Sequence, residues 1–258
     1  MHQMKKLIAA NWKMNKAVPE AVSAAEELKK LVKNAKNAEV VVCPPFTALE
    51  AVGKELKKSN IKLGAQNMHF EGSGAYTGDI SPLMLKSIGC EYVILGHSER
   101  REFFKEDDML INKKVASALS HKLKPILCVG ENLEERNRHW TQEVLEKQLN
   151  NCLQNVTKKQ MKNVTIAYEP VWAISRGDPN HKAATSKDAE EGHALIRNFL
   201  SIIFDRKTAE NTRIIYGGSM KPENAKDLLS RKGIDGGLVG NASLNAKSFA
   251  EIVKAAEN

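Results

Sequence analysis

Residues 40–65 read VVVCPPFTALEAVGKELKKSNIKLGA, and this stretch contains the unit from which the rest of the chain is built. It begins with the apolar run Val40–Cys43, passes through a helix-like stretch at Ala48–Leu56 and ends in a second apolar run, Ile61–Ala65. Both runs are continuously apolar, as is typical of parallel strands covered on both faces. The stretch therefore predicts a strand, a crossover helix and a parallel strand.

The same alternation continues along the whole chain. The apolar runs expected to form strands are Leu7–Ala10, Val40–Cys43, Ile61–Ala65, Tyr92–Leu95, Ile126–Val129, Val164–Tyr168, Arg213–Tyr216 and Gly237–Val239. Helix-like patterns lie at Ala17–Val32, Ala48–Leu56, Ser81–Ser87, Asp107–Ser120, Leu133–Cys152, Lys187–Phe204, Glu223–Leu229 and Ala246–Ala255. Eight such units in about 250 residues predict an α/β fold, a closed (β/α)8 barrel, as a single domain over residues 1–258.

An open, doubly wound sheet is the alternative architecture. Such sheets usually have fewer strands and a glycine-rich turn after the first strand. Here the first apolar run continues instead into Asn11-Trp12-Lys13. The glycine-rich string at residues 72–78, GSGAYTG, lacks the spacing of a dinucleotide-binding turn and does not directly join a strand to a helix. These features favour the closed barrel.

Composition excludes several classes of protein. No stretch approaches the ~20 consecutive apolar residues of a membrane-spanning helix. The apolar run near the N-terminus, Leu7–Ala10, is too short for a signal peptide, so we expect a cytoplasmic protein. Lys and Arg outnumber Asp and Glu by 39 to 31, a net charge of +8, but the lysines are scattered without interleaved aromatic residues. The pattern indicates solvated helix faces rather than a nucleic-acid site; a weak field that favours a small anionic substrate is the alternative.

The cysteines and histidines give no sign of a metal site. Cys43, Cys90, Cys128 and Cys152 have no CxxC spacing, and the seven histidines form no zinc-type cluster. Three of the cysteines, all but Cys152, lie in or beside apolar runs. We therefore expect buried free thiols and no metal.

Polar or glycine-rich residues follow several of the apolar runs. They are Asn11 and Lys13, Gln66-Asn67, Gly96-His97-Ser98-Glu99, Glu169, Gly217-Gly218-Ser219 and Gly240-Asn241. Each has an ordinary interpretation by itself: a lysine in solvent, a histidine in a structural contact, Asn11 bonded to turn backbone, or Ser219 capping a helix. In a parallel barrel, however, all these strand ends meet on one face, which is where barrel active sites lie. The set predicts general-base chemistry beside a bound anion.

The chemistry of these side chains suggests their roles. Glycines in the last two turns let backbone N–H groups approach a phosphate. Pro170 restricts the backbone of Glu169, which would anchor a catalytic carboxylate. His97 and Asn11 are hydrogen-bond donors for a carbonyl oxygen that gains negative charge, and Lys13 supplies a positive charge to the same oxygen.

Several strings in this sequence resemble the triosephosphate isomerase family. They are AANWKMN (9–15), AYTGDIS (75–81), ILGHSERR (94–101), CVGE (128–131), AYEPVWAI (167–174), YGGSMKPENA (216–225) and LVGNASL (238–244). Their order and spacing extend the resemblance over essentially all 258 residues. It implies interconversion of dihydroxyacetone phosphate and D-glyceraldehyde 3-phosphate through an enediol(ate), in glycolysis and gluconeogenesis, without a metal or organic cofactor.

The resemblance also implies a role for each catalytic residue. Glu169 would shuttle the carbon-bound proton, while a neutral His97 would polarise the carbonyl and move protons between the oxygens. Asn11 and Lys13 would bind substrate and stabilise the intermediate, and Glu99 would contact the Lys13 ammonium.

Substrate binding and assembly are implied in the same way. The phosphate would be bound at Ser175, Ser219, Gly240 and Asn241. The loop Met68–Ser81 resembles one that inserts into a second subunit, where Thr77 would reach the Asn11 and Lys13 region of the partner. The resemblance thus implies a homodimer.

The sequence departs from the family pattern at two places. The family's lid reads WAIGTGK, whereas this chain reads WAISRGDPNHK at residues 172–182, with Ser175-Arg176 in place of Gly-Thr and an insertion at Asp178–His181. Backbone donors do not require glycine unless φ is positive, so Ser175 could keep its N–H contact. The second departure is Gly240-Asn241, where the family has Gly-Gly; Asn tolerates a left-handed conformation better than most residues.

Two other functions compete with the isomerase. A Schiff-base aldolase on the same barrel would need a lysine inside the barrel, and no apolar run ends in one. A binding homologue with an altered lid would bind the substrate without turning it over.

Overall fold

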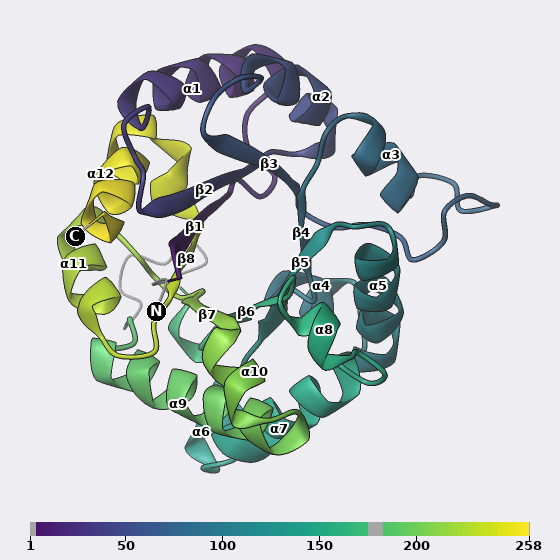
Figure 1. Cartoon of the computed structure of the whole chain (residues 1–258), viewed down its shortest axis with the longest axis vertical. Helices are drawn as coiled ribbons and strands as arrows, with labels where there is room; N and C mark the ends of the chain where they lie inside the picture. Colours follow the sequence, from purple (N-terminus) through teal and green to yellow (C-terminus); the bar gives the residue numbers. More distant parts are fainter. Residues whose placement is uncertain (1–3, 175–182, 258) are drawn as a thin grey trace.

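The computed structural model describes residues 4–174 and 183–257. Its strands form a closed barrel in which each pairs in parallel with its sequence neighbours and β8 closes on β1 (Figure 1). The strands are β1 (Lys6–Asn11), β2 (Ala38–Cys43), β3 (Ile61–Ala65), β4 (Tyr92–Leu95), β5 (Lys124–Val129), β6 (Thr165–Tyr168), β7 (Arg213–Tyr216) and β8 (Gly236–Val239). The predicted closed (β/α)8 barrel is confirmed.

Helices surround the barrel on the outside (Figure 1). Those within the described residues are α1 (Val18–Leu31), α2 (Phe46–Glu55), α3 (Pro82–Ser87), α4 (Ser98–Phe103), α5 (Asp108–Ser120), α6 (Leu133–Asn137), α7 (Thr141–Cys152), α8 (Lys158–Met161), α9 (Ser186–Ile203), α10 (Arg206–Asn211), α11 (Pro222–Ser230) and α12 (Ala246–Ala256). Two short 3-10 helices, η1 (Val171–Ala173) and η2 (Asn241–Leu244), follow β6 and β8.

The continuous apolar runs are explained by two separate cores. Successive side chains of a strand point to opposite faces of the sheet. In β1, Leu7 and Ala9 belong to a cluster inside the barrel, whereas Ile8 and Ala10 belong to the cluster between the barrel and its helices. The middle of each strand is therefore apolar, and polar side chains lie at the strand starts, as Lys6 and Lys124 do, or where the strands end.

The cysteines follow the same pattern. All four are free and buried, as predicted for Cys43, Cys90 and Cys128. Burial raises the pKa of the Cys90 and Cys152 thiols to about 12, so these side chains are not ionised at neutral pH.

One helix prediction is wrong. The sequence pattern predicts a single helix over Leu133–Cys152, but α6 ends at Asn137 and α7 begins at Thr141. His139 between them has a φ of 59°, a left-handed conformation that interrupts a right-handed helix. The periodicity also missed the short helices α4, α8 and α10, of six, four and six residues, although it predicted α3, which has six as well.

The segment between β3 and α3, residues 66–81, projects away from the barrel beyond α3 (Figure 1). Most of its residues from 71 to 79 are exposed in the single chain. In the part of the chain that the structure describes, no helix is long and apolar enough to cross a membrane.

Candidate active site

The first group of the site lies where β1 ends. Asn11 is buried, and its Oδ1 accepts a hydrogen bond from the Lys13 N–H at 3.0 Å, which confirms the expected contact with turn backbone. Lys13 itself has a φ of 50°, in the left-handed region. Gln66 fixes this turn from the end of β3, because its Nε2 donates to the carbonyl oxygens of Lys13 and Cys43, both at 2.9 Å.

The side chain of Lys13 extends from this turn toward the end of β4. Its Nζ lies 2.6 Å from Oε1 of Glu99, an ion pair whose side chains are 29% and 31% exposed. On another side it passes Gly240, where an added Cβ would lie 3.5 Å from Cε of Lys13. The ammonium group thus lies between the turns after β4 and β8, and water can reach it.

His97 follows β4 and is 7% exposed. Its Nδ1 accepts a hydrogen bond from the backbone N–H of Glu99 at 3.3 Å, in the first turn of α4. An accepting Nδ1 leaves the ring proton on Nε2. This Nε2 lies 3.0 Å from Oε1 of Glu169, so the imidazole proton faces the carboxylate.

Glu169 follows β6 and is 2% exposed. Its backbone N–H donates to the carbonyl of Val129 at 2.8 Å, which continues the pairing of β6 with β5 for one residue beyond the strand. Its Oε2 accepts a hydrogen bond from the Ser98 N–H at 2.8 Å. Its Oε1 is buried and lies 3.0 Å from Nε2 of His97, a contact that lowers the pKa of the carboxylate. Oε2 is therefore held by a backbone N–H, and Oε1 faces the imidazole.

Two glycines make room for Glu169. A Cβ on Gly217 would lie 2.7 Å from Cγ of Glu169, and a Cβ on Gly130 would lie 1.7 Å from its carbonyl oxygen. Both distances are too short for carbon–carbon or carbon–oxygen contacts. These positions require glycine because the carboxylate and its backbone are packed against them.

The charges around Glu169 and His97 shift the pKa values of both groups. Burial by itself would raise the pKa of Glu169, but the His97 ring, the Ser98 N–H and Lys13 outweigh it, and the pKa lies below its ordinary value. Burial would lower the pKa of His97, but Glu169 and Glu99 outweigh that effect and the pKa lies above its ordinary value. Glu169 is therefore a carboxylate at neutral pH.

The two glycine-rich turns lie after β7 and β8. Ser219 is half-buried. The sequence suggested that it caps α11, but the capping residue is Lys221. The carbonyl of Ser219 instead accepts from Nδ2 of Asn224 at 3.0 Å. Asn241 begins η2 and does not have a positive φ, so asparagine in place of glycine requires no left-handed conformation here.

Ser175, Arg176 and the insertion Asp178–His181 lie outside the described residues. Thr77 is described and exposed in the single chain, and its predicted contact is with a partner subunit. Within the described residues no group of three or more His, Cys, Asp and Glu side chains could hold a metal ion.

The sequence analysis gave no role to Glu131, which lies directly behind the site. It is fully buried and accepts hydrogen bonds from Nε1 of Trp172 at 2.8 Å and from the Tyr168 hydroxyl at 3.1 Å. Burial raises its pKa above the ordinary value. Glu131 thus ties the end of β6 and the start of the segment after it to β5. The signal available in the sequence was an acidic residue two positions after an apolar run.

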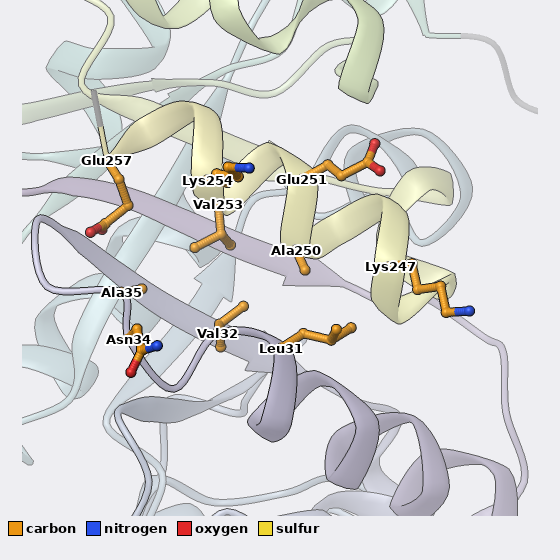
Figure 2. A pocket seen from close by; sticks show the side chains of 10 residues that line it. All are labelled: Leu31, Val32, Asn34, Ala35, Lys247, Ala250, Glu251, Val253, Lys254 and Glu257. Atoms are coloured by element: carbon orange, nitrogen blue, oxygen red, sulfur yellow. The ribbon is translucent and has the colours of Figure 1, made fainter.

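A separate groove lies on the outside of the barrel, between α12 and the end of α1 (Figure 2). It has a volume of about 470 Å³ and its lining contains none of the predicted site residues. The carboxylate of Glu257 at its edge already accepts hydrogen bonds from the backbone N–H groups of residues 36, 37 and 38. The groove lies apart from the strand ends, which remain the candidate active site.

Comparison with known proteins agrees with this location. A family model described as "Triosephosphate isomerase" matches residues 6–256. A triosephosphate isomerase of Clostridium botulinum (strain Okra / Type B1) is 53% identical over 247 residues, which cover 96% of this chain and 98% of the relative. A triosephosphate isomerase of Carboxydothermus hydrogenoformans is 53% identical over 250 residues, which cover 97% and 98% respectively.

Proposed function

Since the chain belongs to the triosephosphate isomerase family and interconverts dihydroxyacetone phosphate and D-glyceraldehyde 3-phosphate, we propose that Glu169, His97, Lys13 and Asn11 carry out this reaction. We include all 258 residues in one catalytic domain, whose site lies at the carboxyl ends of the strands. The observation that carries the assignment is the buried carboxylate of Glu169, with Oε2 held by the Ser98 N–H and Oε1 3.0 Å from Nε2 of His97.

In the proposed first step, the Glu169 carboxylate removes a proton from C1 of dihydroxyacetone phosphate. The electrons of the C–H bond form the C1–C2 double bond, and negative charge moves to the oxygen on C2. The lowered pKa of Glu169 keeps the carboxylate ionised before the step.

The second proposed step uses His97, Asn11 and Lys13. The Nε2–H of His97 donates to the developing oxyanion, and protonation of one substrate oxygen and deprotonation of the other pass through the ring. Glu169 then returns its proton to C2, which leaves an aldehyde at C1. The backbone N–H of Glu99 donates to Nδ1 of His97 and so favours the neutral ring. This effect matters in the second step, because the bound substrate then separates His97 from the charge of Glu169. Lys13 and Asn11 stabilise the negative charge throughout.

We assign the substrate phosphate to the turns after β7 and β8, at Ser219, Gly240 and Asn241, with Ser175 as a further contact. Backbone N–H groups in short turns are suitable phosphate donors, and Lys13 beside Gly240 adds positive charge. No metal or organic cofactor enters these steps. The remaining positive charge of the chain has no part in them.

We further propose that the enzyme is a homodimer, formed through the loop Met68–Ser81. Exposed apolar side chains gather on the segments that follow the first four strands: Met14, Phe46, Tyr76, Leu83, Met84, Phe103 and Phe104. Exposed apolar patches of this kind are typical of interfaces. Thr77 would then reach the Asn11 and Lys13 turn of the partner subunit.

Sedimentation equilibrium tests the dimer. We expect a species of twice the 28.6 kDa chain mass, and a shift toward monomer when Thr77 is replaced by Arg, because a long charged side chain would not fit inside a partner. A monomer at all concentrations of the unsubstituted chain would contradict the proposal.

A cytoplasmic location completes the proposal. Four buried free thiols without a disulfide among the described residues agree with a reducing compartment. Fractionation of the cells that make the protein, followed by an immunoblot, would test the location. Recovery outside the cytoplasm would contradict it.

A coupled isomerase assay on the purified protein tests the function itself. We expect turnover in both directions, and a loss of orders of magnitude in kcat for Glu169→Asp with binding of inorganic phosphate retained. Binding of substrate without turnover would indicate a binding homologue instead. Covalent trapping of substrate by borohydride would indicate Schiff-base chemistry on a lysine.

A further inference from the structure

Arg101 on α4 lies behind the site and donates hydrogen bonds to oxygen atoms of several elements. Its Nε donates to the carbonyl of Gly96 at 2.8 Å, and its Nη2 donates to the carbonyl of Cys128 at 3.2 Å. Its Nη1 donates to Oδ1 of Asp108 at 2.6 Å. The side chain is only 19% exposed. One guanidinium group thus joins the end of β4, the end of β5 and the start of α5.

The two carbonyl groups belong to residues that adjoin the backbone positions of His97 and of the residue bonded to Glu169. Gly96 immediately precedes His97 and Ser98, which provide the imidazole and the N–H donor to Glu169. Cys128 immediately precedes Val129, whose carbonyl accepts the Glu169 N–H at 2.8 Å. A change in the distance between these two strand ends would therefore change the distance between His97 and Glu169.

The space and the acceptors around this side chain fit a planar guanidinium group. A Cβ on Gly96 would lie 3.2 Å from Nη2 of Arg101, and the φ of Gly96 is 69°, so glycine is favoured for both space and conformation. Cys152 from α7 lies 3.6 Å from the same Nη2 and 3.4 Å from Oδ1 of Asp108. A lysine would keep the charge, but its single nitrogen could not donate to both carbonyl groups and the carboxylate in this geometry.

We propose that Arg101 is a positioning residue of the isomerase, which sets the separation of His97 and Glu169 by holding the ends of β4 and β5 together. The inference rests on the proposed roles of His97 and Glu169. Arg101 touches neither substrate nor the reacting atoms. A displacement of about 1 Å in such a constellation costs up to ~100-fold in rate, so the expected effect falls on kcat.

Arg197 provides a matched control. It lies on α9, its side chain is 22% exposed, and it also combines an ion pair with backbone contacts. It donates to the carbonyls of Thr212 at 2.8 Å and Gly233 at 3.4 Å, and to Oδ2 of Asp235 at 2.7 Å. None of these partners adjoins a proposed catalytic residue. Arg197→Lys should therefore cost stability as Arg101→Lys does, without the effect on the reaction.

The test compares Arg101→Lys and Arg197→Lys with the unsubstituted enzyme by kcat, KM, the inhibition constant of inorganic phosphate, and Tm. We expect kcat to fall about 10- to 100-fold in Arg101→Lys, with KM and phosphate inhibition changed less than about 3-fold. In Arg197→Lys we expect an unchanged kcat and a similar decrease in Tm.

Three results would overturn the inference: an unchanged kcat in Arg101→Lys, an equal loss of kcat in both variants, or a loss of phosphate binding that parallels the loss of kcat. If Arg101→Lys does not fold, Asp108→Ala, which removes the acceptor of Nη1, should still lower kcat about 3- to 10-fold at constant KM; no decrease would overturn the inference. Absence of turnover in the unsubstituted protein would instead contradict the proposed function.

Discussion

The backbone N–H of Ser98 donates to Oε2 of Glu169 at 2.8 Å, and this single bond connects the turn after β4 to the end of β6. Because the donor is a backbone group, its position depends on the turn and not on the Ser98 side chain. The bond also turns Oε1 toward His97, whose Nε2 lies 3.0 Å away. The geometry of the proposed base is thus determined by backbone as much as by side chains.

Replacement of Glu169 by Gln should remove the base while keeping the size and shape of the side chain. The amide cannot accept a proton at neutral pH, so we expect kcat to fall by about 10²- to 10⁴-fold. Inhibition by inorganic phosphate should change little, because the phosphate turns are not altered. Steady-state kinetics with a phosphate inhibition series would measure both quantities. A variant with more than a tenth of the original kcat would contradict the assignment.

Replacement of Lys13 by Met should remove the positive charge from the site. Loss of one group that stabilises an oxyanion typically costs about 10²- to 10³-fold in kcat, and KM for the dianionic substrate should rise as well. Both residues have a Cβ, so the φ of 50° is equally strained in either. Lys13→Arg, which keeps the charge, is the control and should retain more activity than Lys13→Met.

Glu99→Gln should have a much smaller effect than Lys13→Met. The Lys13–Glu99 ion pair is about one-third exposed, and ion pairs that water reaches contribute little to stability. We expect the Tm to stay within a few degrees and kcat to change less than about 10-fold. A loss as large as that of Lys13→Met would show that Glu99 takes part in the reaction directly.

Gly217→Ala should disturb Glu169 rather than the barrel. The new Cβ would lie 2.7 Å from Cγ of Glu169, so the carboxylate must move, and we expect kcat to fall at least about 10-fold. Gly53→Ala is the steric control, because its Cβ would meet Cδ2 of Leu63 at 2.8 Å away from the site. That variant should change Tm without changing kcat. Equal kcat values for both variants would refute the explanation.

His193 should make the folded protein sensitive to acid. It is 1% exposed, and burial lowers its pKa from 6.5 to about 4. Its Nδ1 lies 3.0 Å from the Gly233 carbonyl, while Nε2 has no hydrogen-bond partner among the described residues. Between these two pH values the unfolded chain binds a proton that the folded chain does not. The stabilisation is therefore complete above pH 6.5 and is lost as the pH falls toward 4, by up to about 3 kcal/mol.

Urea unfolding at several pH values would measure this loss. His193→Asn keeps a donor for the Gly233 carbonyl but does not titrate in this range, so its free energy of unfolding should fall less between pH 6.5 and pH 4. Equal pH dependence in both proteins would show that other groups account for the acid sensitivity.

The sequence by itself determined the barrel and the composition of its rim. Continuous apolar runs such as Val40–Cys43 and Ile126–Val129 occur because parallel strands in a barrel are covered on both faces. Each run is a local feature, so it can be recognised in the sequence without knowledge of the rest of the fold. The polar residues after those runs, such as His97 and Glu169, were predictable as neighbours because all strands point the same way. Short helices were predicted only in part, since six residues carry little of a helical period: α3 was predicted and α4, of the same length, was missed.

Only the tertiary structure decided which atoms of these residues meet. Residues 98 and 169 pair through a backbone N–H, residues 13 and 66 through a backbone carbonyl, and Arg101 through the carbonyls of residues 96 and 128. Backbone groups are the same in every residue, so a sequence pattern carries no information about which of them is used. The requirement for glycine at 217 likewise arises from a packing distance to Glu169 that exists only after the barrel has closed.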